Sequence, residues 1–196
     1  MKTRLLALTA ALIVTAFLPL LAVGIGKSTA DAPKAPSQSA TPEQADSENR
    51  FLALVAAACE DDFCPEATKA AAIIINTCLS CDKSGFDAAN AEDYASGTEF
   101  DEEQVKAVQS GSRLCITIDG EIKYIPFSKA SRGYTQADEK YPYLCEVASP
   151  WDCFDADFDK NAECTGVSLS GINHLCQNGC SAEEAIRWYL PGAEIK

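Results

Sequence analysis

The pattern of apolar and polar residues divides the chain into three parts. Residues 5–25 form an apolar run without a single charge, and the basic residues Lys2 and Arg4 precede it. As a helix this run would be about 31 Å long, close to the thickness of the bilayer hydrocarbon core. Residues 27–49 are rich in Pro, Ala, Ser and Thr and contain no large apolar side chain, whereas apolar residues recur throughout residues 50–196.

The three parts predict three kinds of segment. Residues 1–26 are an N-terminal membrane anchor or signal, residues 27–49 a disordered tether, and residues 50–196 a folded domain. A cleaved signal peptide usually has a shorter apolar run that ends at small residues. We therefore predict a retained single-pass helix at the cell membrane with the domain outside. The alternative is secretion after signal cleavage.

The first half of the folded part is predicted to consist mainly of helices. Residues 50–59 are apolar and Ala-rich, which is typical of a helix. Pro65 suits the first position of a second helix over residues 65–81, whose Ile73, Ile74 and Ile75 make it hydrophobic on all sides and hence central. Residues 101–110 predict a short amphipathic helix with Val105 and Val108 inward.

The second half of the domain adds strands and a last helix. Residues 113–118 and 121–127 alternate in polarity around Asp119-Gly120, a signal for a type I′ hairpin. Residues 181–184 (S-A-E-E) predict a capping box that opens a final helix, and Pro191-Gly192 predicts its end. The order predicts an α+β fold: one compact domain with helices packed on a small, mostly antiparallel sheet.

Charge and cysteine content limit the function classes. The chain has 16 Lys and Arg against 29 Asp and Glu, and this net charge of -13 argues against nucleic acid as a partner. All 10 cysteines follow residue 58, and His174 is the single histidine. Outside the cell such a set predicts a disulfide framework and no metal site. The neighbours in sequence are Cys59 with Cys64 and Cys176 with Cys180, but spacing leaves the connectivity open. We expect no cofactor, because no nucleotide-binding fingerprint occurs.

Three motifs indicate a family. They are S-K-A-S-R-G-Y-T at residues 128–135, P-Y-L-C-E-V-A-S-P-W-D at 142–152, and S-A-E-E-A-I-R-W-Y-L-P-G-A-E-I at 181–195. Together they resemble the core signature of the stage II sporulation protein D/LytB family, which remodels bacterial peptidoglycan. The resemblance implies an extracytoplasmic protein that acts on peptidoglycan glycan strands, in sporulation or in cell-wall turnover.

The resemblance also implies a reaction and a set of site residues. Relatives are lytic transglycosylases, which cut the MurNAc–GlcNAc bond without water. Residues 56–65 (A-A-A-C-E-D-D-F-C-P) put Glu60 at the position of the family's catalytic glutamate. One carboxyl group suffices for this reaction, because it first protonates the glycosidic oxygen and then takes a proton from the muramyl 6-hydroxyl. Matching positions implied for substrate binding are Lys69, Ser131, Tyr134 and Thr135.

Departures from the family pattern favour an alternative function. Asn76 replaces the family arginine, Arg132 replaces a glycine, and Glu163 stands at the family histidine position. The alternative is a catalytically inactive module that binds glycan or enhances a cell-wall amidase, which would then be a protein partner.

Aromatic residues are the last candidates. Tyr141, Tyr143 and Trp151 lie in a loop-rich stretch beside Pro142 and Pro150. Such rings either stack on sugar faces or cover the hydrophobic core, and the sequence leaves both open.

Overall fold

A computed structural model describes residues 42–81, 99–154 and 158–196, all of which belong to one compact unit over residues 40–196. The described part contains five α-helices and five short strands. The helices are α2 (Pro42–Ala58), α3 (Pro65–Leu79), α5 (Glu102–Gly111), α6 (Leu169–Gln177) and α7 (Ala182–Tyr189). The strands are β1 (Ile116–Ile118), β2 (Glu121–Ile122), β3 (Phe127–Ser128), β4 (Val167–Ser168) and β5 (Glu194–Ile195). A 3₁₀ turn, η2, spans Pro150–Phe154.

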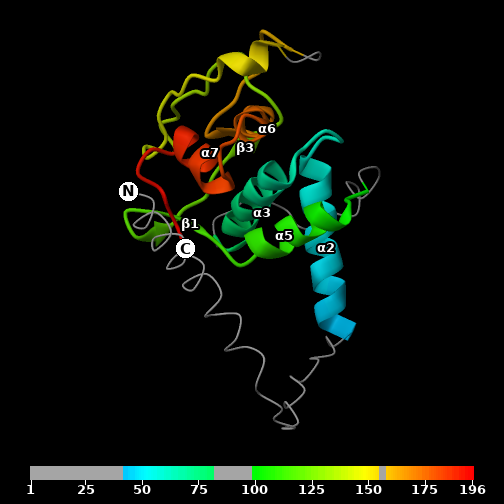
Figure 1. Cartoon of the computed structure of the whole chain (residues 1–196). Coiled ribbons are helices and arrows are strands. Elements are labelled where there is room, and N and C mark those ends of the chain that lie inside the picture. Colours follow the sequence, from blue (N-terminus) through cyan, green and yellow to red (C-terminus); the bar gives the residue numbers. More distant parts are fainter. Residues whose placement is uncertain (1–41, 82–98, 155–157) are drawn as a thin grey trace, which may run out of the picture. The chain divides into compact units, whose positions relative to one another are not determined.

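Helix α3 is the centre of the domain, as its sequence predicts. It contacts α2, α5, α6 and α7, which surround it (Figure 1). Ile73, Ile74 and Ile75 are all buried, and Pro65 is at the start of the helix. Ten residues of α3 are buried in total, so this helix is covered on nearly every side. It ends at Leu79, two residues earlier than predicted, because Ser80 forms the C-cap.

Helix α2 corrects one predicted boundary. It begins at Pro42 instead of residue 50, so residues 42–49 are helical and do not belong to an extended tether. Pro at the first position followed by Glu, Gln and Ala suits the start of a helix, although this stretch has no apolar side chain to reveal it. Leu54 and Val55, farther along α2, are buried in the core.

The predicted hairpin is present, with shorter strands than the pattern suggests. Asp119 and Gly120 both have positive φ, 55° and 79°, as a type I′ turn requires. Strand β1 pairs antiparallel with β2 on one side and with β5 on the other. A separate parallel pair joins β3 to β4, so the sheet structure is divided into two small parts.

Helix termini carry the predicted capping. Ser181 and Glu184 form a reciprocal capping box at the start of α7, as predicted from residues 181–184. A second capping box, between Asp101 and Gln104, opens α5. Within α5, Val108 is buried as predicted, while Val105 is only partly buried.

The fold class is α+β, as predicted. The apolar run at residues 5–25 and residues 27–41 of the expected tether lie outside the described residues. In the ranges that are described, none of the helices is long and apolar enough to cross a bilayer.

Candidate functional site

Glu60 lies in the loop between α2 and α3, at the edge of the domain. Its carboxylate forms an ion pair with Lys129, at 2.8 Å between Oε1 and Nζ. The Lys129 side chain is 65% exposed and that of Glu60 32%. Lys129 belongs to the motif at residues 128–135, so the fold brings Glu60 next to the segment that contains three of the predicted substrate-binding residues.

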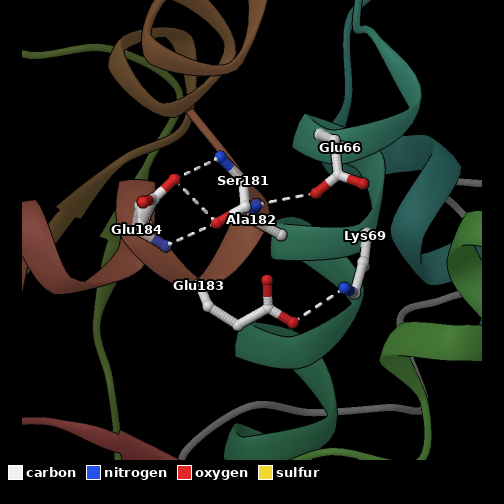
Figure 2. A network of polar contacts seen from close by, with 6 residues as sticks. All are labelled: Glu66, Lys69, Ser181, Ala182, Glu183 and Glu184. Atoms are coloured by element: carbon white, nitrogen blue, oxygen red, sulfur yellow. Dashed lines mark hydrogen bonds and ion pairs between the residues drawn. The ribbon is translucent and has the colours of Figure 1, made fainter. Parts of the chain in front are cut away.

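Lys69, which the resemblance implies for substrate binding, lies on α3 and contacts α7. Its ammonium group is 2.7 Å from Oε1 of Glu183 on α7, and both side chains are largely buried. One turn earlier on α3, Glu66 accepts a hydrogen bond from the backbone N–H of Ala182 at 2.8 Å (Figure 2). Lys69 and Glu66 therefore attach α3 to the N-terminus of α7.

The Lys69–Glu183 pair changes the ionisation of the carboxyl group. Partial burial acts to raise the pKa of Glu183, but the hydrogen bond and charge of Lys69, with help from Arg187, lower this pKa below its ordinary value. The ionised form is therefore favoured in the folded protein.

Ser131 and Thr135 are both buried and serve to hold the loop structure. Ser131 is 1% exposed, and its hydroxyl donates to Asp152. The Thr135 hydroxyl accepts from the backbone N–H of Val147 at 3.1 Å. Tyr134 is 36% exposed, and the Arg132 guanidinium lies over its ring at 4.8 Å. Of the three motif residues, only Tyr134 is thus open to a ligand.

Asp152 is the centre of a buried network that the sequence did not reveal. Its side chain is 1% exposed, and Oδ2 accepts hydrogen bonds from three serine hydroxyls and one backbone N–H. The serines are Ser131, Ser149 and Ser168, which come from three separate segments. Oδ1 is buried without a hydrogen-bond partner within the described part of the chain.

Each of these serines also accepts a hydrogen bond, so the network has a definite direction. The Ser131 hydroxyl accepts from Gly133 N, and that of Ser168 accepts from Gly171 N at the start of α6. Ser149 lies 2.6 Å from the Tyr189 hydroxyl. Because Ser149 uses its proton toward Asp152, we assign Tyr189 as the donor in this contact. The hydroxyl hydrogen bonds of this network thus all point toward Asp152 Oδ2.

Tyr189 joins this network to two tryptophans. It is 1% exposed, and burial raises the pKa of its phenol, which keeps the hydroxyl protonated. Its oxygen accepts from Trp151 Nε1 at 3.2 Å. The indole N–H of the neighbouring Trp188 donates to the Ala148 carbonyl at 2.9 Å. The indole N–H groups of both tryptophans therefore donate to acceptors within the protein.

The two tryptophans and His174 form an aromatic platform at the surface. Trp151 and His174 are stacked with ring centroids 5.4 Å apart and planes 7° from parallel. Trp188 is tilted against Trp151 at 5.4 Å. His174 is exposed, Trp188 is 47% exposed and Trp151 is partly buried. In the sequence, Trp151 is marked by its loop between prolines and His174 as the single histidine, whereas Trp188 is one residue of an amphipathic helix and carries no such mark.

Tyr141 and Tyr143 cover the hydrophobic core. Both are partly buried and pack against the core, together with Tyr124. The Tyr143 hydroxyl donates to the Tyr124 carbonyl at 2.7 Å, and burial raises the pKa of Tyr143 to about 12. These two rings therefore cover the core, whereas Trp151 contributes to the surface platform.

The cysteines are thiols in this structure. All ten lie in described ranges, and none is bonded to another. Cys59 is buried, and burial raises its pKa to about 12. Within the described ranges, no three His, Cys, Asp or Glu side chains are grouped as metal ligands. The predicted disulfide framework stays a prediction.

No protein-family model matches the chain, and no curated protein matches it at a significant level. The family resemblance therefore rests on the motifs themselves.

Proposed function

We propose that the domain is an extracytoplasmic module that binds peptidoglycan glycan strands through the platform of Trp151, Trp188 and His174, held at the membrane by residues 1–26. The observation that carries this proposal is the cluster of the exposed His174 and Trp188 rings with the partly buried Trp151, in which both indole N–H groups already donate to acceptors of the protein. Aromatic rings held in a fixed orientation can pack against the apolar faces of sugar rings, and their rigidity lowers the entropic cost of binding.

The surroundings of the motif residues favour binding over cleavage. A general acid must be free to reach the glycosidic oxygen, whereas the Glu60 carboxylate is already in contact with the Lys129 ammonium group. Ser131, Thr135 and Lys69 use their polar groups in internal contacts. These residues thus support the structure around the platform, which is consistent with an inactive relative of a peptidoglycan-cleaving enzyme or with an amidase enhancer.

A binding experiment tests this proposal. The compact unit of residues 40–196 is titrated calorimetrically with disaccharide and tetrasaccharide fragments of peptidoglycan and is sedimented with insoluble sacculi. Trp188→Ala should weaken binding about tenfold or more, since central aromatic contacts carry much of a binding energy. Ile122→Ala is the matched control, because Ile122 is also apolar and 43% exposed but lies on β2. Equal affinity of both variants and the native domain would reject the platform.

A lytic transglycosylase with Glu60 as the acid/base is the second candidate. The observation that favours it is that Glu60 is partly exposed and in contact with the motif at residues 128–135. Digestion of peptidoglycan would then release anhydro-muramyl ends, which mass spectrometry distinguishes from the reducing ends of hydrolysis. Glu60→Gln should lower that rate by about 10²–10⁴-fold. Binding without any released product would reject catalysis and leave the binding proposal standing.

A further inference from the structure

Cys64 lies against α6 although it is far from this helix in the sequence. It is the N-cap residue of α3, and its backbone N–H donates to Asn173 Oδ1 at 3.1 Å. Asn173 and Cys176 are three residues apart on α6, so their side chains share one face of the helix. The contact with Asn173 therefore brings Cys64 to the face that contains Cys176.

Cys176 has thiols on both sides. It is 8% exposed, and the Cys64 and Cys180 thiols are both near enough to influence its ionisation. The backbone N–H of Cys180 donates to the Leu175 carbonyl at 3.1 Å, which folds the chain back over the end of α6. Burial, with smaller effects of the neighbouring thiols and of Glu66, raises the pKa of Cys176 to about 12.

Polar contacts between α3 and the N-terminus of α7 hold the three cysteines in place. Ala182, two residues after Cys180, donates its N–H to Glu66 in the first turn of α3 (Figure 2). Lys69 and Glu183 add an ion pair one turn farther along. The start of α3 is thus fixed to both α6 and α7, and the three thiols lie where these helices meet.

We propose that Cys64 and Cys176 are a dithiol–disulfide site that covalently joins the N-terminus of α3 to α6, with Cys180 as a second partner for Cys176. This pairing differs from the one that sequence spacing suggests, in which Cys59 is joined to Cys64 and Cys176 to Cys180. The oxidant is a small disulfide such as glutathione disulfide. The inference is independent of what the aromatic platform binds.

The reaction has two exchange steps. The partly exposed Cys64 thiolate attacks the oxidant disulfide, forms a mixed disulfide and releases one thiolate. The Cys176 thiolate then attacks the Cys64 sulfur, forms the protein disulfide and releases the second thiolate. Two protein thiols are oxidised, one oxidant disulfide is reduced to two thiols, and the two protons go to the released thiolates.

Burial of Cys176 makes the second step dependent on pH. Only the thiolate is a nucleophile, and at neutral pH this buried group is almost entirely protonated. Decay of the Cys64 mixed disulfide should therefore become about tenfold faster for each pH unit between pH 7 and pH 9.

Peptide mapping of the full chain tests the pairing. The reduced protein is exposed to glutathione disulfide, quenched, alkylated and cut with a Glu-specific protease. Residues 61–66 (D-D-F-C-P-E) then contain Cys64 as their single cysteine, and residues 164–183 contain Cys164, Cys176 and Cys180. We expect these two peptides to be linked, with fragment ions that assign the bond to Cys176. A Cys64 that stays free, or is bonded to any other cysteine, would overturn the proposal.

Cysteine-to-serine variants test which thiols form the bond. Cys180→Ser should still form the bond between Cys64 and Cys176, whereas Cys64→Ser should divert Cys176 to Cys180. Cys145→Ser is the matched control, because Cys145 is exposed and outside this cluster. Circular dichroism verifies that each variant is folded. Loss of the Cys64–Cys176 bond in folded Cys180→Ser, or a rate of closure that does not vary with pH, would contradict the mechanism.

Discussion

At the scale of single residues, Asp152 has the largest structural consequence. Four donors from three segments converge on one of its carboxylate oxygens, so this side chain joins the loop at residues 131–133, the turn η2 and the start of α6. Through Ser149 and Tyr189 it also sets the position of Trp151. A polar group of this kind stabilises one arrangement of loops as long as all its donors are satisfied.

Replacement of Asp152 should therefore be costly. Asp152→Ala leaves three buried hydroxyls and a backbone N–H without their acceptor, and we expect a loss of about 3–5 kcal/mol in the free energy of unfolding. Asp152→Asn retains one acceptor oxygen and should lose less, about 1–3 kcal/mol. Equilibrium unfolding in urea measures both. Equal losses for the two variants would show that the acceptor oxygen is not the important feature.

Gly171 is a position where close approach requires glycine. A Cβ here would lie 1.9 Å from the Tyr189 hydroxyl and 2.7 Å from Trp151 Nε1. Gly171→Ala should therefore displace the Tyr189 side chain and destabilise the protein by about 1–3 kcal/mol. It should also alter the near-ultraviolet circular dichroism of Trp151. Gln109→Ala, at an exposed position of α5, is the control and should stay within about 0.5 kcal/mol of the native protein. An unchanged tryptophan signal in Gly171→Ala would contradict this prediction.

At the scale of elements, polar side chains of α3 position its neighbours. The Thr77 hydroxyl donates to the Ile73 carbonyl and accepts from the N–H of Ile116, the first residue of β1. This contact is buried and joins the central helix to the antiparallel sheet. Lys69 joins the same helix to α7.

Thr77 offers a test of the contact between helix and sheet. Thr77→Val keeps the shape of the side chain but leaves the Ile116 N–H unsatisfied, which should cost about 1–3 kcal/mol of stability. Thr77→Ser keeps the hydroxyl and should cost less. Urea unfolding together with amide hydrogen exchange at Ile116 provides the measurement. Fast exchange in Thr77→Val but not in Thr77→Ser is the expected result, and the same protection in both variants would reject it.

The Lys69–Glu183 pair predicts a stability loss in acid. The pKa of Glu183 is lowered in the folded protein, so the pair contributes stability above the unfolded-state pKa and loses it as the pH falls through the lowered value. This window lies below about pH 4.3. A double-mutant cycle with Lys69→Met and Glu183→Gln should give a coupling of about 0.5–1 kcal/mol at pH 7. The coupling should vanish at low pH, and a constant coupling would contradict the assignment.

At the scale of the whole molecule, α2 belongs to the folded unit. Leu54, Val55 and Cys59 are buried against the rest of the core. The fragment of residues 40–196 should therefore unfold in a single transition, because it retains the complete unit. Removal of α2 in a fragment of residues 60–196 should lower stability by about 3–6 kcal/mol, since the core loses these buried side chains. Scanning calorimetry compares the two fragments, and equal midpoints would show that α2 is dispensable.

The sequence by itself determined the elements that depend on neighbours in the chain. The apolar run of Ile73, Ile74 and Ile75 identifies the central helix, Asp119-Gly120 identifies the hairpin, and residues 181–184 identify the start of α7. These signals are local, because each concerns propensity, capping or turn geometry over a few residues. The start of α2 at Pro42 could not be predicted from the sequence, since residues 42–49 provide no large apolar side chain that would mark a helix face.

Only the tertiary structure decided how distant polar and aromatic residues combine. It paired Lys69 with Glu183 and Glu60 with Lys129, collected three serines around Asp152, and brought Trp188 to Trp151 and His174. It also brought Cys64 to the face of α6 that contains Cys176. Apart from Ser149 and Asp152, these contacts join segments separated by many residues. The Lys69–Glu183 and Cys64–Cys176 contacts follow from the packing of α6 and α7 on α3. No local pattern specifies such proximity, because it arises only once the helices share a core.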